Sequence, residues 1–244
     1  MTRRLSGLFK ALLLSTLMYA GAAAQGAGGG AEGLIARGNE RYARAEYEAA
    51  IKVYALVPPD AGEAYAQALY NMGVCRFELW QTEEAARLYR LAVEARGGRY
   101  PKASYALGVA LEELGRAAEA KEAYERAAKG AGFAPAHYKL GMLAAARGDV
   151  AGAAAHFREA IRRSKGKFPA SHNNLGVMFA RAGRLDEAER AFEAALSESG
   201  GKFEEAAHNL RLCRTLLAAG RAGGGAAAAS GLKVAAADDW FRRR

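Results

Sequence analysis

Five glycines recur at nearly constant intervals, and this recurrence limits the fold more than any other feature of the sequence. The glycines, separated by 35, 35, 33 and 35 residues, are Gly38, Gly73, Gly108, Gly141 and Gly176. An aromatic residue follows each of them sixteen positions later: Tyr54, Tyr89, Tyr124, Phe157 and Phe192. Aromatic residues make up only 9% of the chain, so an unbroken column of five indicates an internal repeat.

Two further columns indicate what the repeating unit is. An alanine stands twelve residues after each glycine: Ala50, Ala85, Ala120, Ala153 and Ala188. Three copies have a second glycine seven residues after the first: Gly115, Gly148 and Gly183. Ala45 and Trp80 stand at this position in the other two copies. Small residues let two helix backbones approach closely, and the second glycine can take the positive φ that ends the first helix. The aromatic residue then fills the space between its own unit and its neighbour. The columns therefore predict an all-α chain of stacked helical hairpins.

These columns resemble those of the tetratricopeptide repeat family over about residues 31–202. The resemblance implies a right-handed superhelical solenoid of five helix-turn-helix repeats. Residues 203–219 resemble another first helix with no second helix after it, as a terminal capping helix does. We therefore place the solenoid with its capping helix at 34–219, a flexible linker at 25–33, and a Gly/Ala-rich flexible tail with a basic end at 220–244.

Residues 1–24 have the three parts of a secretory signal peptide. Three basic residues and no acidic residue lie among the first ten, and an apolar or small-residue stretch follows at 11–24. Ala22 and Ala24 form a small-x-small pattern, which predicts cleavage after Ala24 and a periplasmic or secreted location. The stretch is short for a bilayer span, which needs about 20 residues, so we expect no membrane span after cleavage. A retained membrane anchor and an organelle transit peptide stay open as alternatives.

The resemblance also implies where a partner would bind, because the first helix of each repeat lines the inner surface in this family. The positions two and three before each glycine, and the one after it, then face a concave groove, and Lys102 adds positive charge. The candidate partner-binding residues are Asn39, Tyr70, Asn71, Lys102, Tyr105, Tyr138, Lys139, Met142, Asn173, Asn174, His208 and Asn209. Tyrosine offers contact area together with a hydroxyl, and an asparagine amide can both donate to and accept from a peptide backbone. The sequence leaves open that the tyrosines only pack between adjacent first helices.

Chaperone-binding members of the family carry a carboxylate clamp in this groove. Asn39, Asn71 and Lys102 stand at three of its positions. Ile35 and Ala106 stand where its two other basic residues belong. Because the match is partial, we do not predict a clamp.

No residue pattern indicates catalysis or a cofactor. The sequence lacks a nucleophile elbow, a phosphate loop and a zinc-protease motif. His137 and His172 occupy the same place in successive repeats, but no carboxylate or cysteine recurs beside them, so we interpret them as packed side chains and predict no metal site. His156 is interpreted as a surface residue. Cys75 and Cys213 are expected to be buried, unpaired thiols.

The sequence thus predicts a non-enzymatic scaffold that binds a partner's peptide or helix in the groove, outside the cytoplasm. The net charge of +9 comes without a basic run interleaved with aromatics, so we predict no nucleic-acid partner. The alternative is a structural subunit of a cell-envelope or secretion assembly that docks through its outer face or its basic tail. Residues 240–244, Trp-Phe-Arg-Arg-Arg, are a docking peptide for an acidic partner, a segment that folds back into the groove, or an unstructured end.

Overall fold

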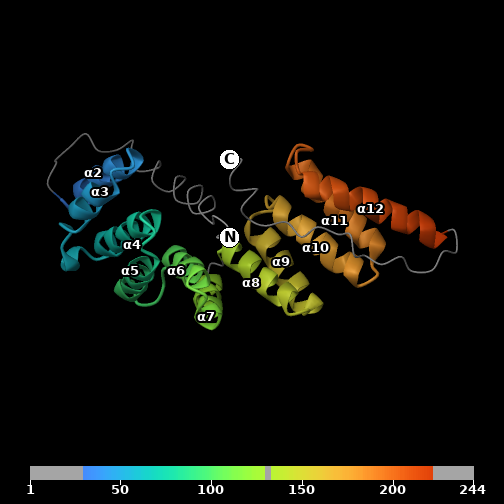
Figure 1. Ribbon diagram of the computed structural model, residues 1–244, viewed down its shortest axis with the longest axis horizontal. Coiled ribbons are helices and arrows are strands. Elements are labelled where there is room, and N and C mark those ends of the chain that lie inside the picture. Colours follow the sequence, from blue (N-terminus) through green and yellow to red (C-terminus); the bar gives the residue numbers. More distant parts are fainter. Residues whose placement is uncertain (1–29, 130–132, 222–244) are drawn as a thin grey trace. The chain divides into compact units, whose positions relative to one another are not determined.

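The computed structural model describes residues 30–129 and 133–221, and within these ranges the chain is helical with no strand (Figure 1). The all-α prediction is therefore confirmed. The predicted leader at 1–24 and most of the tail at 220–244 lie outside the described residues. The chain divides into two compact units, one ending at Ala131 and the other starting at Gly132.

The first unit contains three consecutive helical hairpins. Its helices are α2 (Ala31–Ala43), α3 (Tyr47–Tyr54), α4 (Glu63–Glu78), α5 (Thr82–Ala95), α6 (Pro101–Glu113) and α7 (Ala117–Ala128). A short 3-10 helix, η2 (Pro59–Ala61), lies between the first two hairpins. Each helix packs on the next, and α2 also packs on α4, so these two first helices lie side by side. Helix α2 starts at Ala31, inside the segment that the sequence assigned to a linker.

The second unit contains two hairpins and a final single helix. Its helices are α8 (Ala134–Ala146), α9 (Val150–Arg163), α10 (Pro169–Arg181), α11 (Leu185–Glu198) and α12 (Glu204–Arg221). Helix α12 packs on both α11 and α10, which is the place of a capping helix. Arg214 fixes it to α11 through ion pairs with Glu189 and Glu193, both at 2.6 Å. In both units, consecutive helix pairs stack as the repeat columns predict.

The turn inside each hairpin uses the left-handed backbone that the second glycine column predicts. Gly115, Gly148 and Gly183 have φ between 73° and 78°. Ala45 and Trp80 hold the same conformation at φ 58° and 62°, although a side chain makes it less favourable. The backbone N–H groups of these turn residues and of the residues after them donate to the last carbonyls of the first helix, which ends it.

The first glycine of each repeat is required by the aromatic ring sixteen residues later. A methyl group in place of the glycine hydrogen would lie 2.5–2.7 Å from the ring in four repeats: Gly73, Gly108, Gly141 and Gly176. Gly38 is crowded by the ring of Tyr54 in the same way. All five rings are at most 1% exposed. The sequence interpretation attributed the glycine to close approach of two backbones, but the group that occupies the space is the ring of the same hairpin.

The expected state of the two cysteines also has an outcome in the structure. Cys75 and Cys213 are both buried and unpaired, as expected. None of the helices in the described ranges combines the length and the apolar character that crossing a bilayer requires.

Candidate partner-binding surface

The tyrosines predicted to line the groove in the first unit are buried inside the hairpins. Tyr70 is 4% exposed, and its ring packs against Tyr89 and Tyr100, with both centroid distances at 5.7 Å. Tyr105 is 3% exposed and packs against Tyr124 at 5.6 Å. Burial raises the pKa of Tyr70 well above its usual value, so its hydroxyl stays neutral. These rings offer a partner almost no accessible area and instead pack inside the hairpins.

Tyr138 in the second unit repeats this arrangement. Its ring is 1% exposed, lies 5.7 Å from that of Phe157 and stacks on Phe168 at 5.2 Å. Phe168 stands in the linker before α10, as Tyr100 stands before α6. The aromatic residue that precedes each of these helices therefore covers the tyrosine of the preceding first helix. The packing role that the sequence left open describes all three tyrosines.

The asparagines of the second unit form a buried ladder across three first helices. Asn209 Nδ2 on α12 donates to Asn173 Oδ1 on α10 at 2.8 Å. Asn173 Nδ2 donates to Asn174 Oδ1 at 3.1 Å, and Asn174 Nδ2 donates to the Tyr138 hydroxyl on α8, also at 3.1 Å. None of the three asparagines exposes any surface. Their amides bind one another across the repeats and are not presented to a partner.

The first unit has a shorter version of this ladder, and part of it reaches the surface. Asn39 Oδ1 on α2 accepts from the Tyr54 hydroxyl at 2.7 Å and from Asn71 Nδ2 on α4 at 3.2 Å. Asn71 is 6% exposed, whereas Asn39 is only half-buried. Asn39 therefore keeps part of its side chain at the surface.

Five of the predicted residues have partly exposed side chains: Asn39, Lys102, Lys139, Met142 and His208. Lys102 lies in the first turn of α6, and burial lowers the pKa of its ammonium group. No carboxylate of the described residues forms an ion pair with it. Lys139 and Met142 lie on one face of α8, three residues apart, and His208 lies on α12. The accessible part of the predicted surface is thus basic and apolar, with two amide or imidazole groups.

The sequence interpretation missed one pairing, between His137 on α8 and His156 on α9. Their Nδ1 atoms lie 3.4 Å apart, although His156 was interpreted as a surface residue. The two positions differ by nineteen residues, and so do Tyr70 and Tyr89, which also touch. This shared spacing of nineteen residues is the sequence signal that predicts the contact between the two histidines. His172, the other histidine of the predicted column, pairs instead with Glu198 at 3.1 Å.

Comparison with known families identifies the repeats. Two tetratricopeptide repeat models match the sequence, one over residues 101–129 and one over residues 138–203. The chain therefore contains tetratricopeptide repeats. Proteins with these repeats are generally scaffolds for protein–protein interaction, and the stacked hairpins of this chain have the same architecture.

Solved tetratricopeptide repeat structures share the fold at low sequence identity. The crystal structure of MamA is 23% identical, with 68% of this chain and 95% of that chain covered at a TM-score of 0.56. YrrB, described as having an unusual peptide-binding site, is 21% identical over 82% of this chain and 96% of that chain at 0.53. PilF of Pseudomonas aeruginosa is 17% identical over 79% and 91% at 0.59. No curated protein sequence matches this tetratricopeptide repeat chain significantly.

Proposed function

We propose that this tetratricopeptide repeat protein is a non-enzymatic adaptor that holds an acidic peptide or helix of another protein on its first helices. The observation that carries the proposal is the half-buried ammonium group of Lys102, which has no carboxylate partner among the described residues. A partly desolvated charge gains more from an incoming carboxylate than a fully hydrated one does. Lys102 is therefore the proposed anchor in the first unit.

The second unit offers its own set of contacts on α8. Lys139 supplies a second ammonium group, and Met142 supplies a flexible apolar side chain that adapts to different partners. His208 on α12 adds a polar group at the capping end. Together these residues favour a partner in which carboxylates alternate with apolar side chains, as on one face of an amphipathic helix. The peptide-binding site in the description of YrrB supports a peptide as the occupant.

The test combines capture with charge reversal. The mature chain is used to capture its partner from a native extract, and the captured protein is titrated against Lys102→Glu and Lys139→Glu. We expect binding to weaken about tenfold or more in each variant, because a hydrogen bond to a charged group contributes roughly 1.5–3 kcal/mol.

Lys52→Glu is the matched control, since it makes the same charge change at an exposed position on the second helix α3. It should bind like the wild type. Wild-type affinity in both Lys102→Glu and Lys139→Glu would exclude the first helices as the binding surface.

We further propose that this adaptor acts outside the cytoplasm, in the periplasm or as a secreted protein. The support is the three-part leader at 1–24. Cell fractionation and N-terminal sequencing of the native protein test it. The expected result is a chain that begins at Gln25 and is found outside the cytoplasm, and an intact leader on cytoplasmic protein would refute the proposal.

A second candidate function is a structural subunit of an envelope or secretion assembly that docks through its outer face. Leu56, which lies just after α3, and Leu91 on α5 favour it, because they occupy the same position in successive repeats and are 64% and 40% exposed. Leu56→Glu combined with Leu91→Glu should then abolish assembly while peptide capture persists. Deletion of 220–244 tests the basic tail in the same assay, and assembly that survives both changes rules out this candidate.

A further inference from the structure

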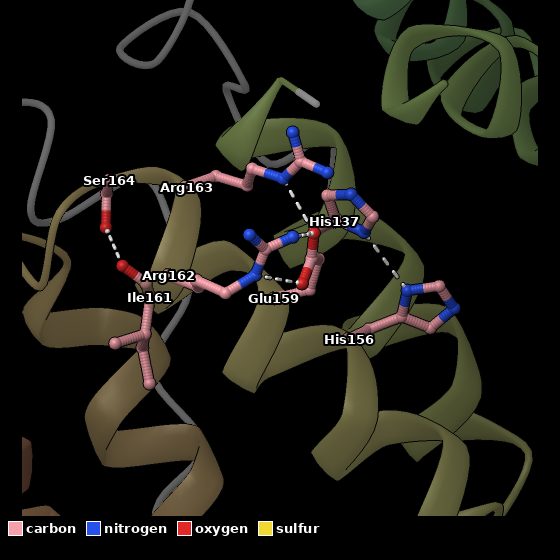
Figure 2. A network of polar contacts seen from close by, with 7 residues as sticks. All are labelled: His137, His156, Glu159, Ile161, Arg162, Arg163 and Ser164. Carbon is pink, nitrogen blue, oxygen red and sulfur yellow. Dashed lines mark hydrogen bonds and ion pairs between the residues drawn. The ribbon is translucent and has the colours of Figure 1, made fainter. Parts of the chain in front are cut away.

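Two histidine rings face one another inside the first hairpin of the second unit (Figure 2). His137 on α8 and His156 on α9 have ring centroids 5.7 Å apart and an interplanar angle of 36°. Their Nδ1 atoms are the nearest polar atoms, at 3.4 Å. Both side chains are part-buried.

The separation of the two nitrogens is long for a hydrogen bond but suits two ligands of one metal ion. Hydrogen bonds from N–H groups in proteins are usually about 2.9–3.0 Å long. Imidazole nitrogens bind Zn²⁺ at about 2.0–2.1 Å, so two of them in a tetrahedral site lie about 3.3–3.4 Å apart. We infer that His137 and His156 form a two-histidine site for a late first-row divalent cation such as Zn²⁺ or Cu²⁺.

The charges around the pair are mixed, because one carboxylate and two guanidinium groups lie near it. Glu159 follows His156 by one turn of α9 and accepts hydrogen bonds from Arg162 Nε at 2.8 Å and Arg163 Nε at 2.6 Å. These bonds lower the pKa of Glu159 to about 2, so its carboxylate is ionised and offsets one of the two guanidinium charges.

The structure also sets the character of the site. No group of three or more His, Cys, Asp or Glu side chains suited to a metal lies among the described residues, so solvent or another molecule fills the remaining positions. His137 Nε2 is buried without a hydrogen-bond partner there, whereas a ligating histidine usually donates from its second nitrogen. Loss of such a partner typically weakens metal binding by about 10–100-fold. The site is therefore an open, exchangeable one and not a structural metal centre.

The test is a titration of the full chain, without an affinity tag, with Cu²⁺ followed by electron paramagnetic resonance. Cu²⁺ is the sharpest probe, because it binds nitrogen ligands more tightly than the other divalent ions of the series. The wild type should bind about one equivalent that His137→Ala and His156→Ala each lose, with splitting from two imidazole nitrogens. His208→Ala, on α12, is the matched control and should keep this equivalent.

His156→Ala protects the test against misfolding, because this part-buried ring can be removed with less disturbance than that of His137. Circular dichroism confirms that each variant stays helical. Retention of the copper equivalent in either single variant, or a wild-type spectrum with fewer than two imidazole nitrogens, overturns the inference.

Discussion

The two units share the contact inside each hairpin and differ in the contact between hairpins. In both, an aromatic ring of the second helix lies on the glycine of the first. In the first unit, Tyr70 joins successive repeats through the ring of Tyr100, and a single bond between the Asn71 and Asn39 amides joins α4 to α2. In the second unit, three fully buried asparagines join α12, α10 and α8 in addition to the stacked rings of Tyr138 and Phe168. The repeat therefore specifies the hairpin strictly, whereas its stacking can be achieved with different side-chain chemistry.

The units differ in exposed and titratable groups as well. All four histidines of the chain lie in the second unit. The large hydrophobic side chains that are exposed in the described residues lie in the first: Leu56, Trp80 and Leu91. The two halves of one repeat array thus offer different chemistry to other molecules on the same backbone framework.

Removal of the repeat ring is expected to cause the largest loss, and to cause it equally in both units. Tyr124→Ala and Phe192→Ala each delete a fully buried ring. We expect each to lower the free energy of unfolding by roughly 3–5 kcal/mol, measured by urea denaturation. A large loss in one unit and a loss below about 1 kcal/mol in the other would disprove a common hairpin contact.

Deletion of a ladder amide should cost more stability in the second unit than in the first. Asn173→Ala leaves the Asn209 amide without its acceptor in a fully buried site, so we expect a cost of about 1–3 kcal/mol. Asn71→Ala should cost less, about 0.5–1.5 kcal/mol, because Asn39 keeps its bond from the Tyr54 hydroxyl. Urea denaturation measures both. Equal costs would show that the ladder of the second unit has no special role.

Substitutions in the hairpin turns should have smaller effects on the melting temperature, with opposite signs in the two units. Trp80→Gly relieves a left-handed residue whose side chain is 65% exposed, so the melting temperature should rise. Gly183→Ala introduces the same strain in the second unit and should lower it, each change corresponding to about 1 kcal/mol. Thermal melts of the two variants give the answer, and a destabilised Trp80→Gly would mean that the tryptophan makes a stabilising contact.

Thiol labelling compares the opening of the two units without changing their stability. Burial raises the pKa of Cys75 to about 12, so the reactive thiolate is nearly absent at pH 8 while the first unit is folded. Burial also raises the pKa of Cys213, whose sulfur donates to the Leu185 carbonyl in the second unit. With an aromatic disulfide reagent we expect both to react only as their units open. Immediate labelling of either native thiol would contradict its burial.

The sequence predicted the hairpins well because their contact is local. The glycine and the aromatic ring that packs on it lie sixteen residues apart in every repeat, so the regular spacing in the sequence shows the contact directly. The positive φ at Gly115 followed from the same regularity.

The predicted surface was less accessible than the sequence suggested, because exposure depends on the neighbouring hairpin. Tyr70 and Tyr138 stand at positions that face a groove in the family, but the rings of Tyr100 and Phe168 cover them. The asparagine ladder joins residues about 36 apart, and no single repeat shows which amide meets which. The contact of His137 follows from the nineteen-residue offset, which becomes informative only when several pairs with this offset are known to touch.

The most direct test of the stacked-hairpin account is a nuclear Overhauser measurement on glycine α-protons in the folded chain. The account predicts strong cross-peaks and ring-current shifts between each first glycine of a repeat and the ring sixteen residues later, for all five pairs in both units. Absence of these contacts in a well-folded sample, or contacts from the glycines to rings of other repeats, would contradict the hairpin on which the proposed binding surface depends.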